Sequence, residues 1–120
     1  MIIVSKDLKD PVDLQFLRNI TDCDIEFEKD LLKIFIESSK NDIKKMENSL
    51  GDPKSNDWYL SSHSFKGSAA SIGAFPLAKS LEYAQFHKDD SDAEKVKMLK
   101  EIKEKLEVVV KFLTKEFLGK

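Results

Sequence analysis

Apolar residues recur at helical spacing along most of the chain. After the "TDCD" cluster (residues 21–24), two adjoining stripes follow a period near 3.6 residues and together cover about half of a helix circumference. One stripe comprises Phe27, Leu31, Ile34, Phe35 and Ser38, and the other comprises Ile25, Leu32, Ile36, Ile43 and Leu50. This breadth predicts a long helix with neighbours on two sides, as in a bundle.

Two further apolar seams follow in the second half of the chain. The shorter one comprises Leu77, Leu81 and Ala84, and the longer one comprises Leu99, Ile102, Leu106, Val109, Leu113 and Phe117. The run Val108 to Val110 is compatible with a strand, but its flanks keep the spacing of three and four residues, which favours a helix.

Capping signals place the first helix boundaries. Asp10-Pro11 with Asp13 predicts the N-cap, first residue and early-turn carboxylate of a short helix that runs to about Arg18. The "TDCD" cluster offers several caps for the long helix, and Gly51 ends it.

The later boundaries follow the same logic. Asp52-Pro53 restarts the chain into a helix over residues 53–72, and Gly73 followed by Pro76 marks a second stop and restart. "SDAE" (residues 91–94) is a capping box that opens the last helix. All three prolines are therefore predicted at helix starts.

Four substantial helices with short connections predict an all-α fold. We expect an antiparallel four-helix bundle with a short additional N-terminal helix. The 120 residues fit a single domain, 1–120, with a short N-terminal extension over residues 1–9.

Composition narrows the class of protein. A hydrophobic content of 41% with 35% charged residues is typical of a soluble globular protein. Twenty basic against twenty-two acidic residues give a net charge of −2, which offers no basic surface for nucleic acid. The single cysteine, Cys23, forms no internal disulfide, and "MIIV" at the start is too short for a signal peptide or membrane span. These features predict a cytoplasmic protein, and we expect a monomer.

The helix predicted over residues 53–72 carries one unusual position. Trp58, Phe65 and Ile72 recur every seven residues, and with Ser61, Ser68 and Ala69 they form its buried face. His63 lies roughly 200° from the centre of that face and points to solvent. One turn on, Gly67 costs a helix about 1 kcal/mol relative to alanine.

The imidazole therefore stands in open surroundings, which suits the docking of another protein. Tyr59 and Asn56 lie on its N-terminal side, while Gly67 and the small Ala70 lie on its C-terminal side. An imidazole is a good nucleophile near neutral pH, and Lys66 supplies a positive charge for phosphoryl oxygens. Because the chain has neither a Walker A motif nor a glycine-rich ATP loop, it would have to receive a phosphoryl group activated elsewhere.

The stretch "HSFKGSAASIGA" (residues 63–74), followed by "LAKSLEYAQ" (residues 77–85), closely resembles histidine phosphotransfer (HPt) domains of multistep phosphorelays. The shared pattern is the histidine, Lys66-Gly67, a small residue, Gly73 and Leu81-Glu82 in the next helix. The resemblance covers roughly residues 10–115. Phe65, where leucine is commoner, is a small departure because both side chains face the core.

The resemblance implies a specific role. His63 would carry a phosphoramidate and exchange its phosphoryl group with the aspartate of response-regulator receiver domains, including those of a hybrid histidine kinase. The chain would be a phosphocarrier and not an enzyme; it would need no cofactor, and magnesium would sit on the partner receiver. Gln85 matches a position where several members place a glutamine beside the imidazole, to orient the ring or contact the phosphoryl group.

Three alternatives differ in how well the residues support them. His87 lies near a helix end amid "KDDSD", where carboxylates and the helix dipole disfavour a phosphoryl group. A di-iron bundle needs several inward Glu and His ligands with Glu-x-x-His spacing, which two histidines do not provide, so no metal site is predicted. A helical adaptor that binds a signalling partner through the same face, without phosphate, stays open.

Overall fold

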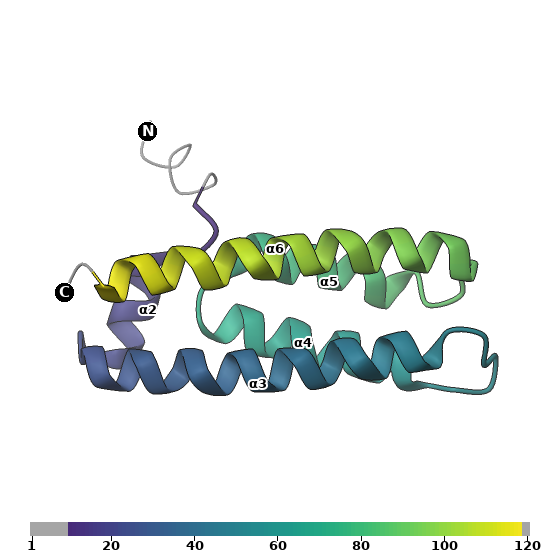
Figure 1. Ribbon diagram of the computed structural model, residues 1–120, viewed down its shortest axis with the longest axis horizontal. Coiled ribbons are helices and arrows are strands. Elements are labelled where there is room, and N and C mark those ends of the chain that lie inside the picture. Colours follow the sequence, from purple (N-terminus) through teal and green to yellow (C-terminus); the bar gives the residue numbers. More distant parts are fainter. Residues whose placement is uncertain (1–9, 119–120) are drawn as a thin grey trace.

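The computed structural model describes residues 10–118, so the predicted extension over residues 1–9 lies outside the described residues. The described residues form five helices and no strand (Figure 1), which confirms the all-α prediction. The helices are α2 (Leu14–Thr21), α3 (Ile25–Ser49), α4 (Asp57–Ser71), α5 (Phe75–Phe86) and α6 (Asp92–Leu118).

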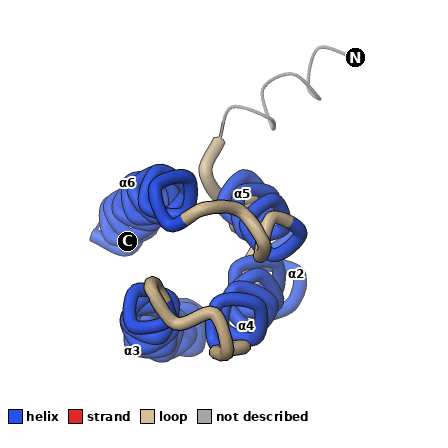
Figure 2. The backbone as a smooth tube through the Cα atoms, turned by 90° about the vertical axis from the view of Figure 1, so that its right-hand side faces the viewer, coloured by secondary structure: helices blue, strands red, loops and turns tan. Residues whose placement is uncertain are grey.

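The four longer helices form an antiparallel bundle. Viewed along its long axis, α3, α4, α5 and α6 surround a common centre in chain order (Figure 2), and α2 lies across one end (Figure 1). The closest packing is between α4 and its neighbours α3 and α5. The predicted bundle with a short additional N-terminal helix is therefore confirmed. Among the helices of residues 10–118, none is long and apolar enough to cross a membrane.

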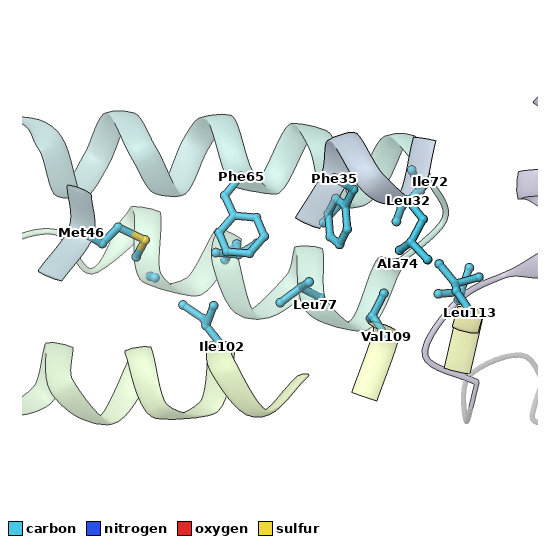
Figure 3. Close-up of a cluster of buried hydrophobic side chains, with 14 of the residues drawn as sticks. Leu32, Phe35, Met46, Phe65, Ile72, Ala74, Leu77, Ile102, Val109 and Leu113 are labelled. Carbon is cyan, nitrogen blue, oxygen red and sulfur yellow. The ribbon is translucent and has the colours of Figure 1, made fainter. Parts of the chain in front are cut away.

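The core consists of apolar side chains from all four long helices (Figure 3). Phe35 of α3 meets Phe65 of α4 with ring centroids 6.2 Å apart. The buried indole of Trp58 donates a hydrogen bond of 2.8 Å to the Ala84 carbonyl and so ties α4 to α5. The seams predicted for α5 and α6 are confirmed. Leu106 and Phe117 are partly buried against the core, and the other members are buried: Leu77, Leu81, Ala84, Leu99, Ile102, Val109 and Leu113.

The apolar stripes predicted for α3 are partly wrong. Phe27 and Ile34 are 45% and 61% exposed. The buried face instead repeats every three and four residues through Glu28, Leu32, Phe35, Ser39, Asp42, Met46 and Ser49. Four members of that face are polar, so a search for apolar repeats does not detect the buried face. Their burial has a cost: desolvation raises the pKa of the Asp42 carboxyl above its usual range, although Lys45 partly opposes the shift.

Two predicted helix starts need correction. The N-cap of α2 is Asp13, which accepts a hydrogen bond from the Phe16 amide, so Asp10-Pro11 lies before the helix. Helix α4 begins at Asp57 and not at Pro53. Asp52 forms a turn around Pro53 instead, because its carboxylate accepts from the Lys54 amide at 3.0 Å and its carbonyl accepts from the Ser55 amide at 3.1 Å.

Helix α2 also runs to Thr21, three residues beyond its predicted end near Arg18. The starts of α3, α5 and α6 agree with the sequence. Within the "TDCD" cluster Asp24 caps α3 by accepting from the Phe27 amide, and Ser91 accepts from the Glu94 amide at the start of α6. Pro76 lies in the first turn of α5, where a missing amide hydrogen costs nothing. Of the three prolines, only Pro76 therefore occupies the predicted position.

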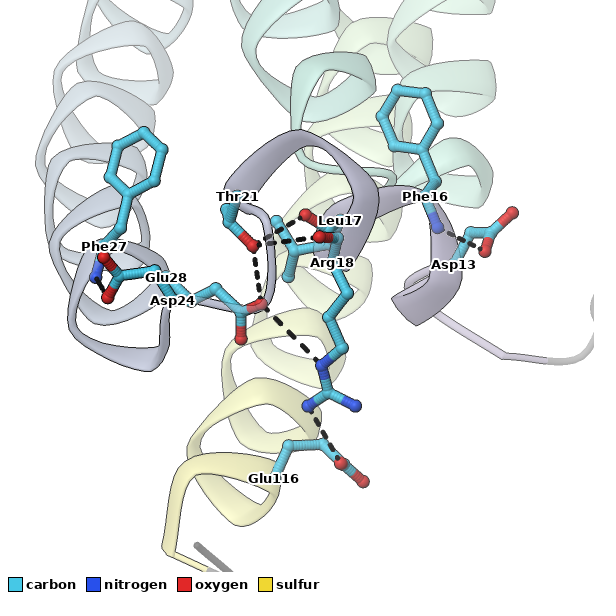
Figure 4. Close-up of polar contacts among 9 residues, drawn as sticks. All are labelled: Asp13, Phe16, Leu17, Arg18, Thr21, Asp24, Phe27, Glu28 and Glu116. Atoms are coloured by element: carbon cyan, nitrogen blue, oxygen red, sulfur yellow. Dashed lines mark hydrogen bonds and ion pairs between the residues drawn. The ribbon is translucent and has the colours of Figure 1, made fainter.

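A buried polar network fastens α2 to the bundle (Figure 4). Glu28 of α3 is 2% exposed and accepts a hydrogen bond of 2.8 Å from the Thr21 hydroxyl. Arg18 lies 3.7 Å from the same carboxylate and 3.6 Å from Glu116 of α6. The network therefore links α2, α3 and α6 at the end of the bundle.

The turn between α4 and α5 depends on Gly73. Its φ is +83°, and its carbonyl accepts a hydrogen bond of 2.9 Å from the amide of Asp13. A Cβ atom at this position would lie 2.9 Å from the Asp13 carbonyl oxygen, which is backbone and has little room to move. Gly51 shares a φ of +83°, but a Cβ there would meet nothing within 4 Å.

The two glycines form a matched pair for mutation. Gly51→Ala should cost about 1 to 2 kcal/mol of unfolding free energy, the price of a left-handed conformation for a residue with a Cβ. Gly73→Ala should cost clearly more, because the clash with Asp13 adds to the same conformational term. Urea denaturation of both variants measures the difference, and equal losses would show that the backbone at Asp13 accommodates a Cβ at position 73 without cost.

Candidate phosphoacceptor site on α4

His63 lies in the middle of α4 on the face that points away from the core. Its side chain is exposed, whereas Trp58, Phe65 and Ala69 of the same helix are buried. This agrees with the orientation expected from the helical periodicity. Within residues 10–118 neither ring nitrogen of His63 makes a hydrogen bond, so either one can be the unprotonated, nucleophilic nitrogen.

Tyr59 and Asn56 precede His63 by one and two turns. The Tyr59 ring lies parallel to the imidazole, with an interplanar angle of 5° and ring centroids 6.3 Å apart. Asn56 is the N-cap residue of α4, but its side chain makes no capping hydrogen bond. The structure thus places Tyr59 directly beside the histidine and Asn56 at the start of the helix.

Gly67 leaves open space one turn after His63. It lies inside the continuous helix α4, and a Cβ atom built on it would meet nothing within 4 Å. Packing within the chain therefore does not require glycine here. Lys66 and Ala70, on the same side of α4, are half-buried, and Lys66 has no ion-pair partner in the described part of the chain.

Gln85 comes from the neighbouring helix α5. Its side chain is 4% exposed, and its amide oxygen is buried without a hydrogen-bond partner. The residue before it, Ala84, accepts the Trp58 hydrogen bond, so this part of α5 packs directly against α4. Residues 10–118 contain no hydrogen bond between Gln85 and His63, which leaves the predicted contact as a prediction.

His87 offers an internal comparison. It is the C-cap residue of α5, and its ring stacks on Tyr83 with centroids 3.8 Å apart. Its Nδ1 atom lies 2.7 Å from the Tyr83 carbonyl oxygen. One nitrogen of this imidazole is therefore engaged with the backbone, unlike those of His63.

One exposed residue beside His63 escaped the sequence reasoning. Leu60 is 57% exposed and lies three residues before the histidine, on an adjacent part of the helix surface. The sequence does contain a signal for this exposed residue: Leu60 is apolar but lies outside the buried heptad positions of α4. For metal binding, the described residues contain no group of three or more His, Cys, Asp or Glu side chains suited to hold an ion.

Comparison with known protein families identifies this arrangement. The family model of the Hpt domain matches residues 30–111, which is more than half of the chain. The chain belongs to the Hpt domain family. Its role is therefore histidine phosphotransfer in a phosphorelay. Comparison with curated proteins gave no match, and neither did comparison with solved structures.

The open space at Gly67 of this Hpt domain generates a test of stability and access. Gly67→Ala should raise the unfolding free energy by about 1 kcal/mol or less, because alanine is the better helix former and its methyl group meets nothing. Gly67→Gln should also keep the fold, but its long side chain would lean back over the turn that carries His63. We expect it to slow phosphotransfer far more than Gly67→Ala does.

The measurements are the melting temperature and the rate of transfer from a phosphorylated receiver domain. Ala93→Gln, which adds the same side chain at an exposed position of α6, is the control. Native transfer by Gly67→Gln would refute the access argument. Lower stability of Gly67→Ala would show that the backbone at Gly67 needs a geometry that alanine does not adopt.

Proposed function

We propose that His63 is the phosphoacceptor of a phosphorelay carrier. It accepts a phosphoryl group from the aspartyl phosphate of one receiver domain and passes it to the aspartate of another. The observation that carries this proposal is the exposed imidazole of His63, whose nitrogens make no hydrogen bond to residues 10–118, next to the open space at Gly67. The alternative histidine, His87, has one nitrogen bound to the backbone.

The proposed chemistry is a reversible exchange. A neutral imidazole nitrogen of His63 attacks the phosphorus of the partner's aspartyl phosphate, a P–N bond forms, and the bond to the carboxylate oxygen breaks. The carboxylate leaves with the electron pair, and the other ring nitrogen keeps its proton. Attack by the carboxylate of a second receiver reverses these steps. The chain itself needs no cofactor for this exchange, and the magnesium ion belongs to the receiver.

Lys66 and Gln85 support the transferred group in different ways. Lys66 is one turn from His63 and pairs with no carboxylate of residues 10–118, so its ammonium is available to phosphoryl oxygens. A buried polar atom without a partner is costly, and the Gln85 amide oxygen is such an atom. We interpret Gln85 as a residue that orients the imidazole or contacts its phosphoryl group.

The docking face proposed for the receivers surrounds His63 on α4. It comprises Tyr59, Asn56, Gly67 and Ala70, to which the structure adds the exposed Leu60. Partners are receiver domains of response regulators or of a hybrid histidine kinase. An adaptor that binds through the same face without accepting phosphate is the competing function, and phosphate incorporation decides between the two.

His63→Gln should abolish phosphate incorporation from a phosphorylated receiver. Because the side chain is exposed and makes no hydrogen bond to the residues that the structure describes, the melting temperature should stay nearly unchanged. His87→Gln is the matched control and should keep full incorporation. Acid-labile, base-stable phosphate on the chain is the quantity to measure. Phosphate retained by His63→Gln would place the acceptor elsewhere, and no phosphate on the native chain would favour the adaptor.

Lys66→Ala should slow transfer by roughly tenfold or less, since a charge pair at a solvent-accessible site is worth about 1 kcal/mol. The difference from the native chain should shrink at high salt, because ions screen the interaction. Lys100→Ala removes an exposed lysine from α6 and should leave the rate unchanged. If Lys66→Ala were as inactive as His63→Gln, the lysine would do more than supply charge.

A further inference from the structure

Both histidines of this chain follow a tyrosine by four residues. Tyr59 precedes His63 on α4, and Tyr83 precedes His87 on α5. In both pairs the rings are close to parallel, at 5° and 16°, with centroids 6.3 and 3.8 Å apart. The wider separation, on α4, still lies within the range over which aromatic rings interact. Within residues 10–118, the pair on α4 is the one whose imidazole makes no hydrogen bond.

The geometry of a helix explains why Tyr59 and not residue 67 meets the imidazole. Side chains on a helix tilt toward its N-terminus, so the ring of His63 leans over the turn of Tyr59. For the same reason a side chain at position 67 would lean over His63, and Gly67 has none. One side of the imidazole is therefore backed by an aromatic ring, and the other faces open space.

The backbone that carries the Tyr59 ring is packed. Tyr59 is 37% exposed and lines a hollow of about 500 Å³ together with Asn56, while its neighbour Trp58 is buried. Its backbone carbonyl also accepts a hydrogen bond of 3.1 Å from the buried Ser62 hydroxyl. Tyr59 thus stands on a well-packed part of α4, whereas no hydrogen bond from the described part of the chain fixes the ring of His63.

We propose that Tyr59 is a positioning residue for the His63 imidazole. By stacking against one face of the ring it restricts rotation of the His63 side chain and holds the reactive nitrogen toward the side that Gly67 leaves open. This role rests on the proposed function of His63 as phosphoacceptor. It acts through the plane of the aromatic ring, so it does not need the tyrosine hydroxyl.

Two measurements that need no receiver domain test this role. The first is the rotamer distribution of His63, from three-bond couplings and ring-to-ring nuclear Overhauser effects with residue 59. The second is the rate of phosphorylation by phosphoramidate. In that reaction an imidazole nitrogen attacks phosphorus, the P–N bond of the donor breaks, and ammonia leaves.

Tyr59→Phe should keep a single His63 rotamer and the native rate, because the stacked ring remains. Tyr59→Ala should give several rotamers and a rate about two- to tenfold lower, which is the range that an aromatic pair is worth. Tyr83→Ala removes the equivalent partner of His87 and should leave both properties of His63 unchanged.

A native rotamer distribution and rate in Tyr59→Ala would overturn the proposal. So would equal losses in Tyr59→Phe and Tyr59→Ala, since the hydroxyl would then be the active group. A loss seen only with a receiver and not with phosphoramidate would make Tyr59 a docking residue instead. These outcomes are distinct from failure of the proposed function, in which the native chain takes no phosphate from any receiver domain.

Discussion

The rotation of α4 about its own axis is the constraint on which the site depends. Trp58, Phe65 and Ala69 are buried on one side of α4, and the Trp58 indole is hydrogen-bonded to α5. Burying each large side chain is worth about 1.5 to 3 kcal/mol. A rotation of α4 about its axis that exposed these side chains would therefore be strongly unfavourable. Because this face is fixed toward the core, His63 is fixed toward solvent. The chemistry of the site thus follows from apolar packing on the opposite side of the helix.

The same helix separates two demands that usually conflict. Its inner face needs tight packing, while its outer face, in the function proposed above, needs room for a receiver domain. Large residues at 58 and 65 meet the first demand, and Gly67, whose missing side chain would point into open space, meets the second. The propensity cost of a glycine inside a helix, about 1 kcal/mol, is small against the burial on the inner face.

Much of this arrangement could be predicted from the sequence, because it depends on local patterns. The heptad of α4, the seams of α5 and α6, and the caps Asp24 and Ser91 are short-range features with one dominant physical cause each. The buried face of α3 was missed because Glu28, Ser39 and Asp42 interrupt its apolar repeat. Their burial depends on partners from other helices, such as Thr21 for Glu28, which no local pattern reveals.

The starts of α2 and α4 were misplaced for a related reason: an Asp-Pro pair is compatible with both a helix start and a turn. At Asp52 the turn prevails through its bonds to Lys54 and Ser55. At the site, helical spacing predicts that Tyr59 lies near His63. The parallel orientation of their rings depends on side-chain rotamers, which the spacing does not define.

Nitrogen-15 NMR tests directly whether His63 is the phosphoacceptor. Spectra of the native chain, with its histidines labelled, are recorded before and after incubation with a phosphorylated receiver domain. Phosphorylation changes the shifts of the imidazole nitrogen that bears the phosphoryl group. We predict that the signals of one imidazole, His63, move to phosphoramidate values while those of His87 stay in place. Movement of the His87 signals, or no movement of either ring, would contradict the assignment.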